Sequence, residues 1–563
     1  MKLLSRYFHT LRYLRFIQWI GRIKVYLPKR IPLGNNIPQK RSINKKWNCI
    51  EWKKQSLFKD RKVKFLNVER KIKNKKDWSN PESKLIWLFN LHYFDGINSK
   101  GSEKRTVIDR GWIDLWINEN PPCKKVAWNP YCTSLRIVNW IKWSLKGNIF
   151  TGKETKSLVI QIRWLIKNLE IQFLGNHYWS NGKALVFAGF YFDGFESKKW
   201  LNLGLKIIDS QLDEQCLSDG GHFERTPMYH ALFLEDILDL INLSQIIPDI
   251  LPANLQEKLL NKARKMLQWL YSMSHPDNEI AFFNDTTFGI GANFKTLLNY
   301  YKKITNHESN ISFSTHSFLF KESGFVRLER NDMVCICDVG SINPKYNPGH
   351  SHAETLSFEM SFKKRRIIVN SGISVYGRSN LRIKQRSTSF HSTLCIDKQN
   401  SSDIWSGFRV GRRAKVRNSN YFSLDNNEIA YASHSGYEYL KGSPIHSRMW
   451  RIENNKLYVY DHIYSSKKHM IEINFIFHPK WYLEILPFNT ILIKEKNADF
   501  PIAFIKYEKD LISKIYNSHW NKGFGISIIN NVLTLKGSNE SVIKKTFFSF
   551  DKLEIKKLLK TIY

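Results

Sequence analysis

The sequence predicts a multidomain α+β protein, in which a helical domain precedes an antiparallel β-sandwich. Three observations support this fold class. The chain of 563 residues is too long for one hydrophobic core. Through the first half, apolar residues recur at three- and four-residue spacing, which is the period of an amphipathic helix. From about residue 315 the period changes to two, and short β-branched or aromatic runs are bounded by turns.

The first zone, residues 1–75, is basic and is interrupted by Pro28, Pro32 and Pro38, which predicts a loosely packed arm. Within it, Leu11–Leu27 has the pattern of a basic amphipathic helix. Such a helix would either lie on an anionic membrane or pack against the body of the protein. Lys and Arg interrupt residues 1–30 too often for the apolar core of a signal peptide, and no long apolar window predicts a membrane-spanning helix.

The second zone, residues 76–310, has a helical pattern broken by polar or glycine-containing turns. The predicted helices include Thr133–Leu145, Lys183–Phe192, Tyr229–Leu243 and Gln256–Ser272. Helical hairpins in series are typical of an α-toroid or a solenoid. The third zone, residues 311–563, contains strand-like runs at Gly324–Leu328, Met333–Val339, Leu356–Phe362, Arg366–Asn370, His391–Asp397, Leu457–Tyr460, Ile471–Phe477 and Ala503–Tyr507. Many short strands without helical crossovers predict an antiparallel sandwich.

The excess of basic residues favours an anionic binding partner. Lys and Arg outnumber Asp and Glu by 87 to 50, a formal net charge of +37, which favours nucleic acid, an anionic membrane or an acidic polysaccharide. Dispersed lysines that form a solvated surface would give the same charge. The seven cysteines show no CxxC or zinc-finger spacing and give no disulfide framework, so they leave the redox compartment open.

One short motif suggests proton chemistry or metal binding. Gly349–Glu354 precedes a strand-like run and carries His350 and His352 at alternate positions. On an extended backbone these two side chains project to the same face. Histidine moves protons or binds metals near neutral pH. An isolated pair of this kind is more typical of a solvated turn, and it is the surrounding His, Asn and Tyr residues that favour a site.

Three upstream segments supply these further groups. Asn176-His177 opens a predicted helix, where the asparagine could cap the helix or could hold an anion at its positive end. Tyr229 stands in the first turn of another helix, after the glycine-containing segment Asp219–His222. A lone tyrosine is usually a packed core residue. Asn284-Asp285 adds a polar loop within the helical zone.

Together these segments resemble the heparinase II/III-like polysaccharide lyases. The matching segments are Phe89–Asp95, Trp128–Tyr131, Ser134–Ile137, Asn139-Trp140, Asn176-His177 and Gly221–His230 in the helical zone, and Gly349–His352, Val369–Gly372, Gln385–Thr388 and His391–Thr393 in the sandwich zone. They follow in matching order over roughly residues 76–480, which is more specific than any single motif. The resemblance is strongest to members encoded with bacterial surface-polysaccharide assembly, and it implies an incomplete (α/α) toroid followed by a β-sandwich.

The resemblance implies β-elimination of a uronic-acid-containing glycan, as in the glycosaminoglycan and alginate lyases. The substrate carboxylate must be neutralised, a base must take the C5 proton, and an acid must protonate the departing O4. Asn176, with His177 nearby, resembles the neutralising group. Tyr229 resembles the tyrosine that protonates the leaving group, and it would also be the base in a syn elimination. His350 resembles the base on the opposite face.

Around these residues, we expect His222, Glu224, Tyr376 and Arg386 to contact the substrate. Arginine suits this task because its guanidinium binds a carboxylate or sulfate with two parallel hydrogen bonds. Other arginines of the same region, Arg378, Arg382 and Arg409, are interpreted as surface charges or internal salt bridges.

His352, Asn370 and His391 match positions that hold a structural zinc in some family members. An aspartate normally stands where this chain has Asn370, and an amide is a weaker ligand without charge. A zinc ion held here would fix the loop that carries His350 rather than take part in the chemistry.

Other functions fit parts of the pattern. A non-catalytic glycan-binding protein that assists surface-polysaccharide assembly would use the same scaffold. A hydrolase would need paired carboxylates, for which Asp95, Asp219, Glu224 and Asp285 are available. Nucleic-acid binding would explain the net charge, but no helix-turn-helix, zinc-finger or RNA-recognition signature is present. The family resemblance implies the cell envelope or periplasm, and the absence of a clear signal peptide favours the cytoplasm instead.

Overall fold

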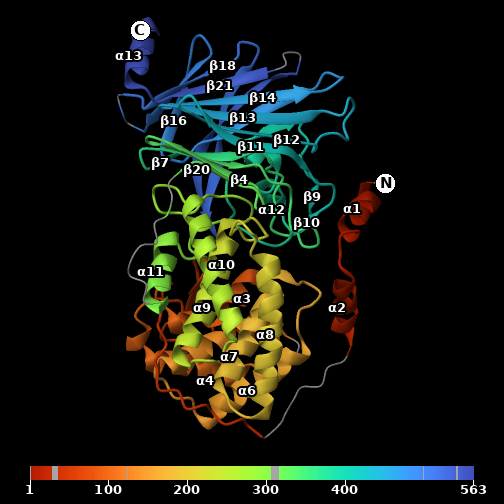
Figure 1. The fold of residues 1–563 in the computed structure, drawn as a ribbon, viewed down its shortest axis with the longest axis vertical. Helices are drawn as coiled ribbons and strands as arrows, with labels where there is room; N and C mark the ends of the chain where they lie inside the picture. The colour runs from red at the N-terminus through yellow and green to blue at the C-terminus, as the bar shows by residue number, and fades with distance from the viewer. Residues whose placement is uncertain are drawn as a thin grey trace.

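The computed structural model describes residues 2–27, 36–122, 125–305, 313, 316–496, 498, 500–539 and 543–562. Helices fill one end of the molecule and sheets fill the other, while the first two helices of the chain run along one side (Figure 1). The predicted order, a toroid of helices followed by an antiparallel β-sandwich, is confirmed.

The helical domain (residues 36–305) is built from helices that follow one another with short connections. They are α3 (Leu85–Tyr93), α4 (Thr106–Glu119), α5 (Pro130–Leu145), α6 (Gly152–Lys167), α7 (Gly175–Tyr191), α8 (Phe195–Gln215), α9 (Pro227–Ile246), α10 (Ala253–Ser272) and α11 (Phe294–Thr305). The local sequence explains where several of these helices begin. Thr151 and Glu154 form a capping box at the start of α6, and Asn129 caps α5 with Pro130 in its first turn.

The helices α7 and α9 matter most, because their first turns carry the predicted site residues. Buried charges fix the two helices together. Lys183 of α7 donates to Asp236 and Asp239 of α9, and Asp239 also accepts from Lys142 of α5. Such a buried network costs desolvation but specifies one arrangement of its helices. The positions of Asn176 and Tyr229 are therefore set by a rigid frame.

Part of the predicted arm belongs to the core of the helical domain. Residues 62–71 form a hairpin of β1 (Lys62–Phe65) and β2 (Val68–Lys71). Trp47, Leu57 and Val63 are buried in the same hydrophobic cluster as the toroid helices. These apolar side chains explain the difference from the loosely packed arm that the prolines predicted. Among the described residues of this zone, the helices α1 (Lys2–Leu11) and α2 (Phe16–Tyr26) contribute no residue to this core.

The sandwich domain (residues 316–562) contains three larger antiparallel sheets. A five-stranded sheet holds β3 (Phe318–Phe320), β4 (Phe325–Arg330), β5 (Met333–Asp338), β6 (Phe358–Phe362) and β7 (Arg365–Ile368) in chain order. A four-stranded sheet has the order β19 (Ile512–Gly523), β20 (Ile526–Ser538), β15 (Met470–Ile476) and β8 (Leu394–Ile396).

The third sheet has eight strands and crosses the top of the molecule in Figure 1. Its order is β11 (Val416–Leu424), β12 (Asn427–His434), β13 (Ile445–Glu453), β14 (Lys456–Tyr464), β21 (Ile543–Ser549), β18 (Ala503–Tyr507), β17 (Thr490–Glu495) and β16 (Trp481–Leu486). One apolar cluster includes residues of all three sheets. A small hairpin, β9 (Ile404–Trp405) and β10 (Arg409–Val410), and the helices α12 (Asn380–Gln385) and α13 (Lys552–Ile562) complete the domain.

Polar contacts tie the two domains together beside the predicted site. Arg225 precedes α9 and donates to the backbone carbonyls of Ser341 and Glu322 in the sandwich domain. The Asp219 carboxylate accepts from the Ser323 backbone N–H at 2.7 Å. Arg225 has a positive φ of 56°, a conformation unfavourable for a large side chain. These contacts fix the loop before α9 against the sheets.

Candidate active site between the helical and sandwich domains

The site residues come from four segments that meet where the helices end and the sheets begin. The helical domain supplies the first turn of α7, with Asn176 and His177, and the first turn of α9, with Tyr229. The sandwich domain supplies the loop between β5 and β6, with His350, and the loop between β7 and α12, with Tyr376. The predicted site residues of the helical domain and those of the sandwich domain thus meet at the boundary between the two domains.

Tyr229 and His350 are in direct contact. Their ring centroids lie 4.1 Å apart with the planes inclined by 34°. The Tyr229 hydroxyl lies 3.2 Å from the hydroxyl of Tyr376. Burial, followed by the charge of Tyr131, raises the pKa of Tyr229 well above its usual value, so the phenol remains an O–H donor at neutral pH. The three side chains are each partly exposed.

The Asp285 carboxylate is hydrogen-bonded to His350 and to His352. One carboxylate oxygen lies 2.8 Å from His350 Nδ1, and the other lies 2.8 Å from His352 Nε2. Arg382 donates to both oxygens. Burial alone would raise the pKa of Asp285, but the Arg382 charge and the two histidine hydrogen bonds hold it well below its usual value.

An ionised carboxylate can only accept hydrogen bonds, which fixes the tautomers of both histidines. His350 carries its proton on Nδ1, which leaves Nε2 with a free lone pair. That nitrogen is the atom able to accept a proton. The arrangement of carboxylate and imidazole is the one that orients a general base.

Asn176 and His177 lie beside this group. The Asn176 side chain is not a cap, because the cap position of α7 is Leu174, and within the described residues its amide makes no hydrogen bond. His177 Nδ1 lies 3.0 Å from Glu170 Oε1, and its ring packs on Tyr131 at 4.4 Å. A half-buried amide without a protein partner, in the first turn of a helix, is suited to bind an anion.

The Glu224 carboxyl group lies near the start of α7 and within electrostatic range of both His177 and His350. A β-carbon placed on Gly175 would be 3.6 Å from Glu224 Oε1, so the carboxyl group faces the start of α7. The side chain is 1% exposed, and in the described part of the chain neither of its oxygens has a hydrogen-bond partner. Burial raises the pKa of Glu224, while the charges of His350 and His177 act in the opposite direction. An unpartnered buried carboxyl group of this kind is typical of a functional site.

The structure gives two predicted substrate contacts a supporting position instead. Arg386 is fully buried and donates to the backbone carbonyls of Ser351 and Gly407, so its guanidinium braces the His350 loop. His222 is 1% exposed, and its Nε2 faces Gln215 Oε1 at 3.3 Å. Burial lowers the pKa of His222 well below its usual value. The Arg386 guanidinium is bonded to protein carbonyl groups, whereas His222 Nδ1 is buried without a hydrogen-bond partner among the described residues. Residue type alone does not reveal either arrangement.

The predicted metal ligands are brought together in part. His352 Nδ1 lies 3.1 Å from His391 Nε2, and Glu354 Oε2 lies 3.1 Å from the same His391 nitrogen without forming a hydrogen bond. His352 uses its N–H on Asp285, and His391 uses its own on the Ser387 carbonyl at 2.8 Å. Three lone pairs therefore converge. A metal ion or an added proton between these atoms would remove the repulsion of their lone pairs. Two imidazoles with a carboxylate are an ordinary donor set for zinc.

Asn370 is directed elsewhere. Its amide nitrogen donates to the Phe282 carbonyl at 2.9 Å, and its amide oxygen accepts from the Ser392 backbone N–H at 3.3 Å. Glu354, rather than Asn370, completes the group with His352 and His391. The alternation of the motif contained this signal, because positions 350, 352 and 354 are successive alternate residues.

Sequence reasoning also missed what supports His350. The sequence indicates Asp285 as part of a polar loop and as one candidate carboxylate of a hydrolase, and Arg382 as a surface or salt-bridge residue. Both are fully buried. They lie 97 residues apart in the chain, and only the meeting of the two domains makes them neighbours.

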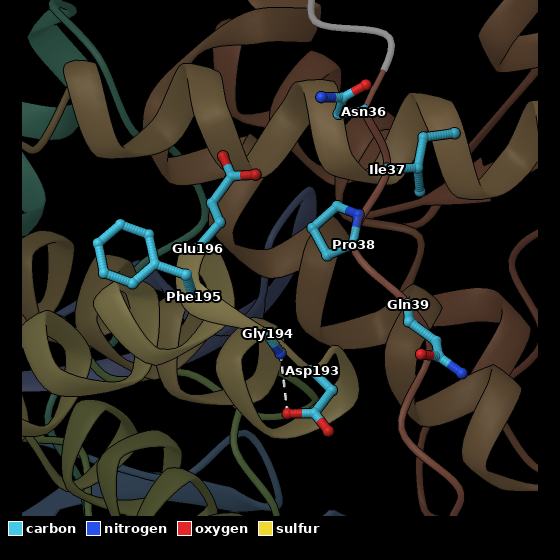
Figure 2. A pocket seen from close by; sticks show the side chains of 8 residues that line it. All are labelled: Asn36, Ile37, Pro38, Gln39, Asp193, Gly194, Phe195 and Glu196. Atoms are coloured by element: carbon cyan, nitrogen blue, oxygen red, sulfur yellow. Dashed lines mark hydrogen bonds between the residues drawn. The ribbon is translucent and has the colours of Figure 1, made fainter.

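A separate hollow of about 440 Å³ lies on the helical domain, between residues 36–39 and 193–196 (Figure 2). Its carboxylates belong to Asp193 and Glu196, and Glu196 pairs with Arg163. No residue of this hollow belongs to the predicted site. An acidic lining without an unpaired base disfavours an anionic glycan there.

Comparison with known families gives two matches in series. The heparinase II/III N-terminus matches residues 110–313, and the heparinase II/III-like C-terminal domain matches residues 314–525. A heparin-sulfate lyase of Bacteroides thetaiotaomicron is 25% identical over 348 residues, covering 52% of this chain and 48% of that protein. A heparin-sulfate lyase of Bacteroides stercoris is 22% identical over 453 residues, covering 71% of this chain and 65% of that protein. The chain thus spans about half to two thirds of the length of these relatives.

Solved structures show the same fold. A crystal structure of heparinase III has a TM-score of 0.65 and 18% identity, over 85% of this chain and 80% of that chain. A heparan sulfate lyase from Pedobacter heparinus has a TM-score of 0.56 and 14% identity, over 95% and 87% of the respective chains. At this identity the likeness concerns the architecture alone.

Proposed function

Because this chain belongs to the heparinase II/III-like family, we propose that it is a polysaccharide lyase that cleaves a uronic-acid-containing glycan by β-elimination. The observation that carries the proposal is the contact of Tyr229 with His350, whose Nδ1 is held by Asp285. A phenol and an oriented imidazole at a domain boundary are the acid and base that the elimination needs.

The steps follow from the protonation states. The Nε2 lone pair of His350 accepts the C5 proton, and the electron pair left on C5 forms the C4–C5 double bond as the C4–O4 bond breaks. The Tyr229 hydroxyl gives its proton to the departing O4. Because its pKa is raised, Tyr229 carries that proton at neutral pH. The product is a new non-reducing end with an unsaturated uronate.

Charge on the substrate carboxylate grows as the C5 proton leaves, and it must be compensated. The unpartnered amide of Asn176 and the backbone N–H groups at the start of α7 are suited to this role. Glu224 would repel a uronate if it were ionised. Burial raises the pKa of Glu224, which favours the protonated form, and that form would donate a hydrogen bond to the substrate rather than repel it.

The supporting residues position these groups. Asp285 and Arg382 orient His350, and Arg386 holds the backbone of the same loop at Ser351. When bound, a zinc ion would supply a fixed positive charge that joins His352 and Glu354 to His391. The acid and base of the proposed reaction are protein side chains, so this charge would act on the position of the His350 loop.

The carboxylates considered for hydrolysis do not form a free pair. Asp95 is bound by Lys53 and Asn139, and Asp219 is bound by the backbone of Ser323. Asp285 is occupied by His350, His352 and Arg382. Of the four, Glu224 alone lacks a partner, whereas glycoside hydrolysis by this route needs two acting carboxyl groups.

The test is a panel of uronate glycans, including glycosaminoglycans with and without sulfate and alginate, assayed with the wild type and with Tyr229→Phe. We expect depolymerisation of at least one polymer by the wild type and a loss of about 10²–10⁴-fold in kcat for the variant. Equal activity of the two proteins would remove Tyr229 from its role. Binding of a polymer without turnover would favour a glycan-binding protein.

A further inference from the structure

Residues 2–27, called the arm below, form two helices that lie against both domains. The α1 helix is fixed to the sandwich domain, where Arg6 donates to the Asp403 carboxylate and the Tyr7 ring packs on Trp405 with centroids 5.1 Å apart. The α2 helix is fixed to the helical domain. Both lie along one side of the molecule (Figure 1). The arm is thus anchored at two places and presents one face outward.

The inner face of α2 makes close contact. Gln18 is buried and donates to the Gln172 carbonyl at 3.3 Å. Gly21 is also buried, and a β-carbon there would come within 2.6 Å of the Gln172 backbone nitrogen. A side chain at this position would push the helix away, so glycine sets the close approach. This contact fixes which side of α2 faces solvent.

The outer face is a stripe of large apolar side chains. On α2 these are Phe16 (79% exposed), Trp19 (42%), Ile23 (67%) and Tyr26 (88%). Their spacing of three, four and three residues places them on one helix face. On α1, Leu4 (76% exposed), Phe8 (62%) and Leu11 (36%) repeat the pattern. Single exposed apolar residues are ordinary, but two successive helices that each carry several of them on one face mark an interaction surface.

The charge of the arm identifies the partner. Its charged residues are Lys2, Arg6, Arg12, Arg15, Arg22 and Lys24, and it contains no Asp or Glu. Arg6 and Arg15 are paired with acidic groups of the body. The guanidinium of Arg22 lies 5.5 Å from the Trp19 ring, so a basic group borders the apolar stripe directly. The partner must accept apolar and aromatic side chains and carry negative charge beside them.

We propose that the outer face of the arm binds the surface of an anionic lipid bilayer. Trp and Tyr rings lie at the boundary of headgroups and acyl chains, and Lys and Arg contact the phosphates. No helix in the described ranges is long and apolar enough to cross a membrane, so the arm lies on the surface. A symmetric contact between two arms would bring like charges together. An acidic polysaccharide would match the charge but not the stripe.

The test uses the full chain in vesicle sedimentation. Phosphatidylcholine vesicles are compared with vesicles that also contain phosphatidylglycerol. We expect binding to the anionic vesicles that weakens as salt is raised. Phe16→Ser/Ile23→Ser should weaken this binding at least about tenfold, since two exposed apolar groups no longer enter the lipid. Arg22→Glu/Lys24→Glu should weaken it by a similar factor.

The matched control is Leu424→Ser/Phe488→Ser, which changes two exposed apolar residues of the sandwich domain (57% and 77% exposed). It should bind anionic vesicles as the wild type does. Failure of the wild type to bind, equal binding by the arm variants, or equal binding to uncharged vesicles would overturn the proposal. A second outcome would also overturn the proposal. In it, anionic vesicles do not sediment the wild type, and light scattering shows a wild-type dimer that Phe16→Ser/Ile23→Ser abolishes. None of these outcomes depends on lyase activity.

Discussion

Asp285 Oδ2 lies 2.8 Å from His350 Nδ1, and this contact joins a loop of the helical domain to a loop of the sandwich domain. The carboxylate is kept ionised by Arg382, so it holds the imidazole proton on Nδ1 and leaves the Nε2 lone pair free for the proposed role of base. The proposed active site is therefore assembled by domain contact rather than by one segment of the chain.

Replacement of Asp285 by asparagine should reduce kcat by about 10²–10⁴-fold with a smaller change in KM. An amide can donate as well as accept, so the tautomer of His350 is no longer fixed. The measurement is steady-state kinetics on the polymer that the wild type cleaves. Asp277→Asn is the matched control, because Asp277 also pairs with a buried arginine, Arg366, away from the site. A folded Asp285→Asn protein with unchanged kcat would exclude this positioning role.

Arg382→Met should destabilise the fold, because it leaves the Asp285 carboxylate buried without its counter-charge. Loss of one partner from a buried pair costs about 3–5 kcal/mol in the free energy of unfolding. Chemical denaturation gives this value. Lys363→Met serves as the control, since Lys363 and Asp332 form an exposed pair worth less than about 1 kcal/mol. Adding Asp285→Asn to Arg382→Met should recover part of the loss, and a purely additive double variant would contradict the account.

The convergence of His352, Glu354 and His391 predicts a bound zinc ion, one per chain, measurable by elemental analysis of the purified protein. His391→Ala and Glu354→Gln should each abolish it and lower the Tm. Asn370→Ala should retain the metal, because the Asn370 amide is bonded to the Phe282 backbone. A metal-free wild type that keeps its Tm after chelator treatment would mean that a proton occupies the contact instead.

A second stability prediction concerns Asp109 in α4. The side chain is fully buried, and within the described residues neither carboxylate oxygen has a partner. Burial raises its pKa to about 7. The folded state therefore binds the proton more tightly than the unfolded state, and wild-type stability falls as pH rises from about 4 to about 7.

Asp109→Asn removes this charge and should be more stable than the wild type at pH 8. The difference should shrink toward zero as the pH falls to about 4, with a slope no steeper than about 1.4 kcal/mol per pH unit. Urea denaturation of both proteins at several pH values measures it. A constant difference across this range would show that Asp109 does not titrate as burial requires.

The sequence predicted the fold because its two halves differ in hydrophobic period. The helices at residues 130–145 and 253–272 and the strands from β4 to β7 follow the predicted ranges closely. The hairpin at residues 62–71 was missed, since dense lysines mask the few apolar residues, such as Val63 and Phe65, that fold into the toroid.

Of the site, the sequence predicted the groups that meet but not what holds them. Tyr229 contacts His350, two residues that the family motifs placed in one site, and its hydroxyl also lies beside that of Tyr376. The Asp285–Arg382 pair and the inward direction of Arg386 depend on where the chain folds back on itself. The sequence does not distinguish an arginine whose guanidinium is bonded to carbonyl groups from an arginine that faces solvent. Glu354 could have been found from the alternation in Gly349–Glu354.

The most direct test of the central claim is the ultraviolet absorbance of the reaction product. Elimination through His350 and Tyr229 creates a C4–C5 double bond conjugated with the uronate carboxylate, so absorbance should rise with each cut by the wild type and not with Tyr229→Phe. New chain ends without this absorbance, carrying only saturated uronates, would contradict the account.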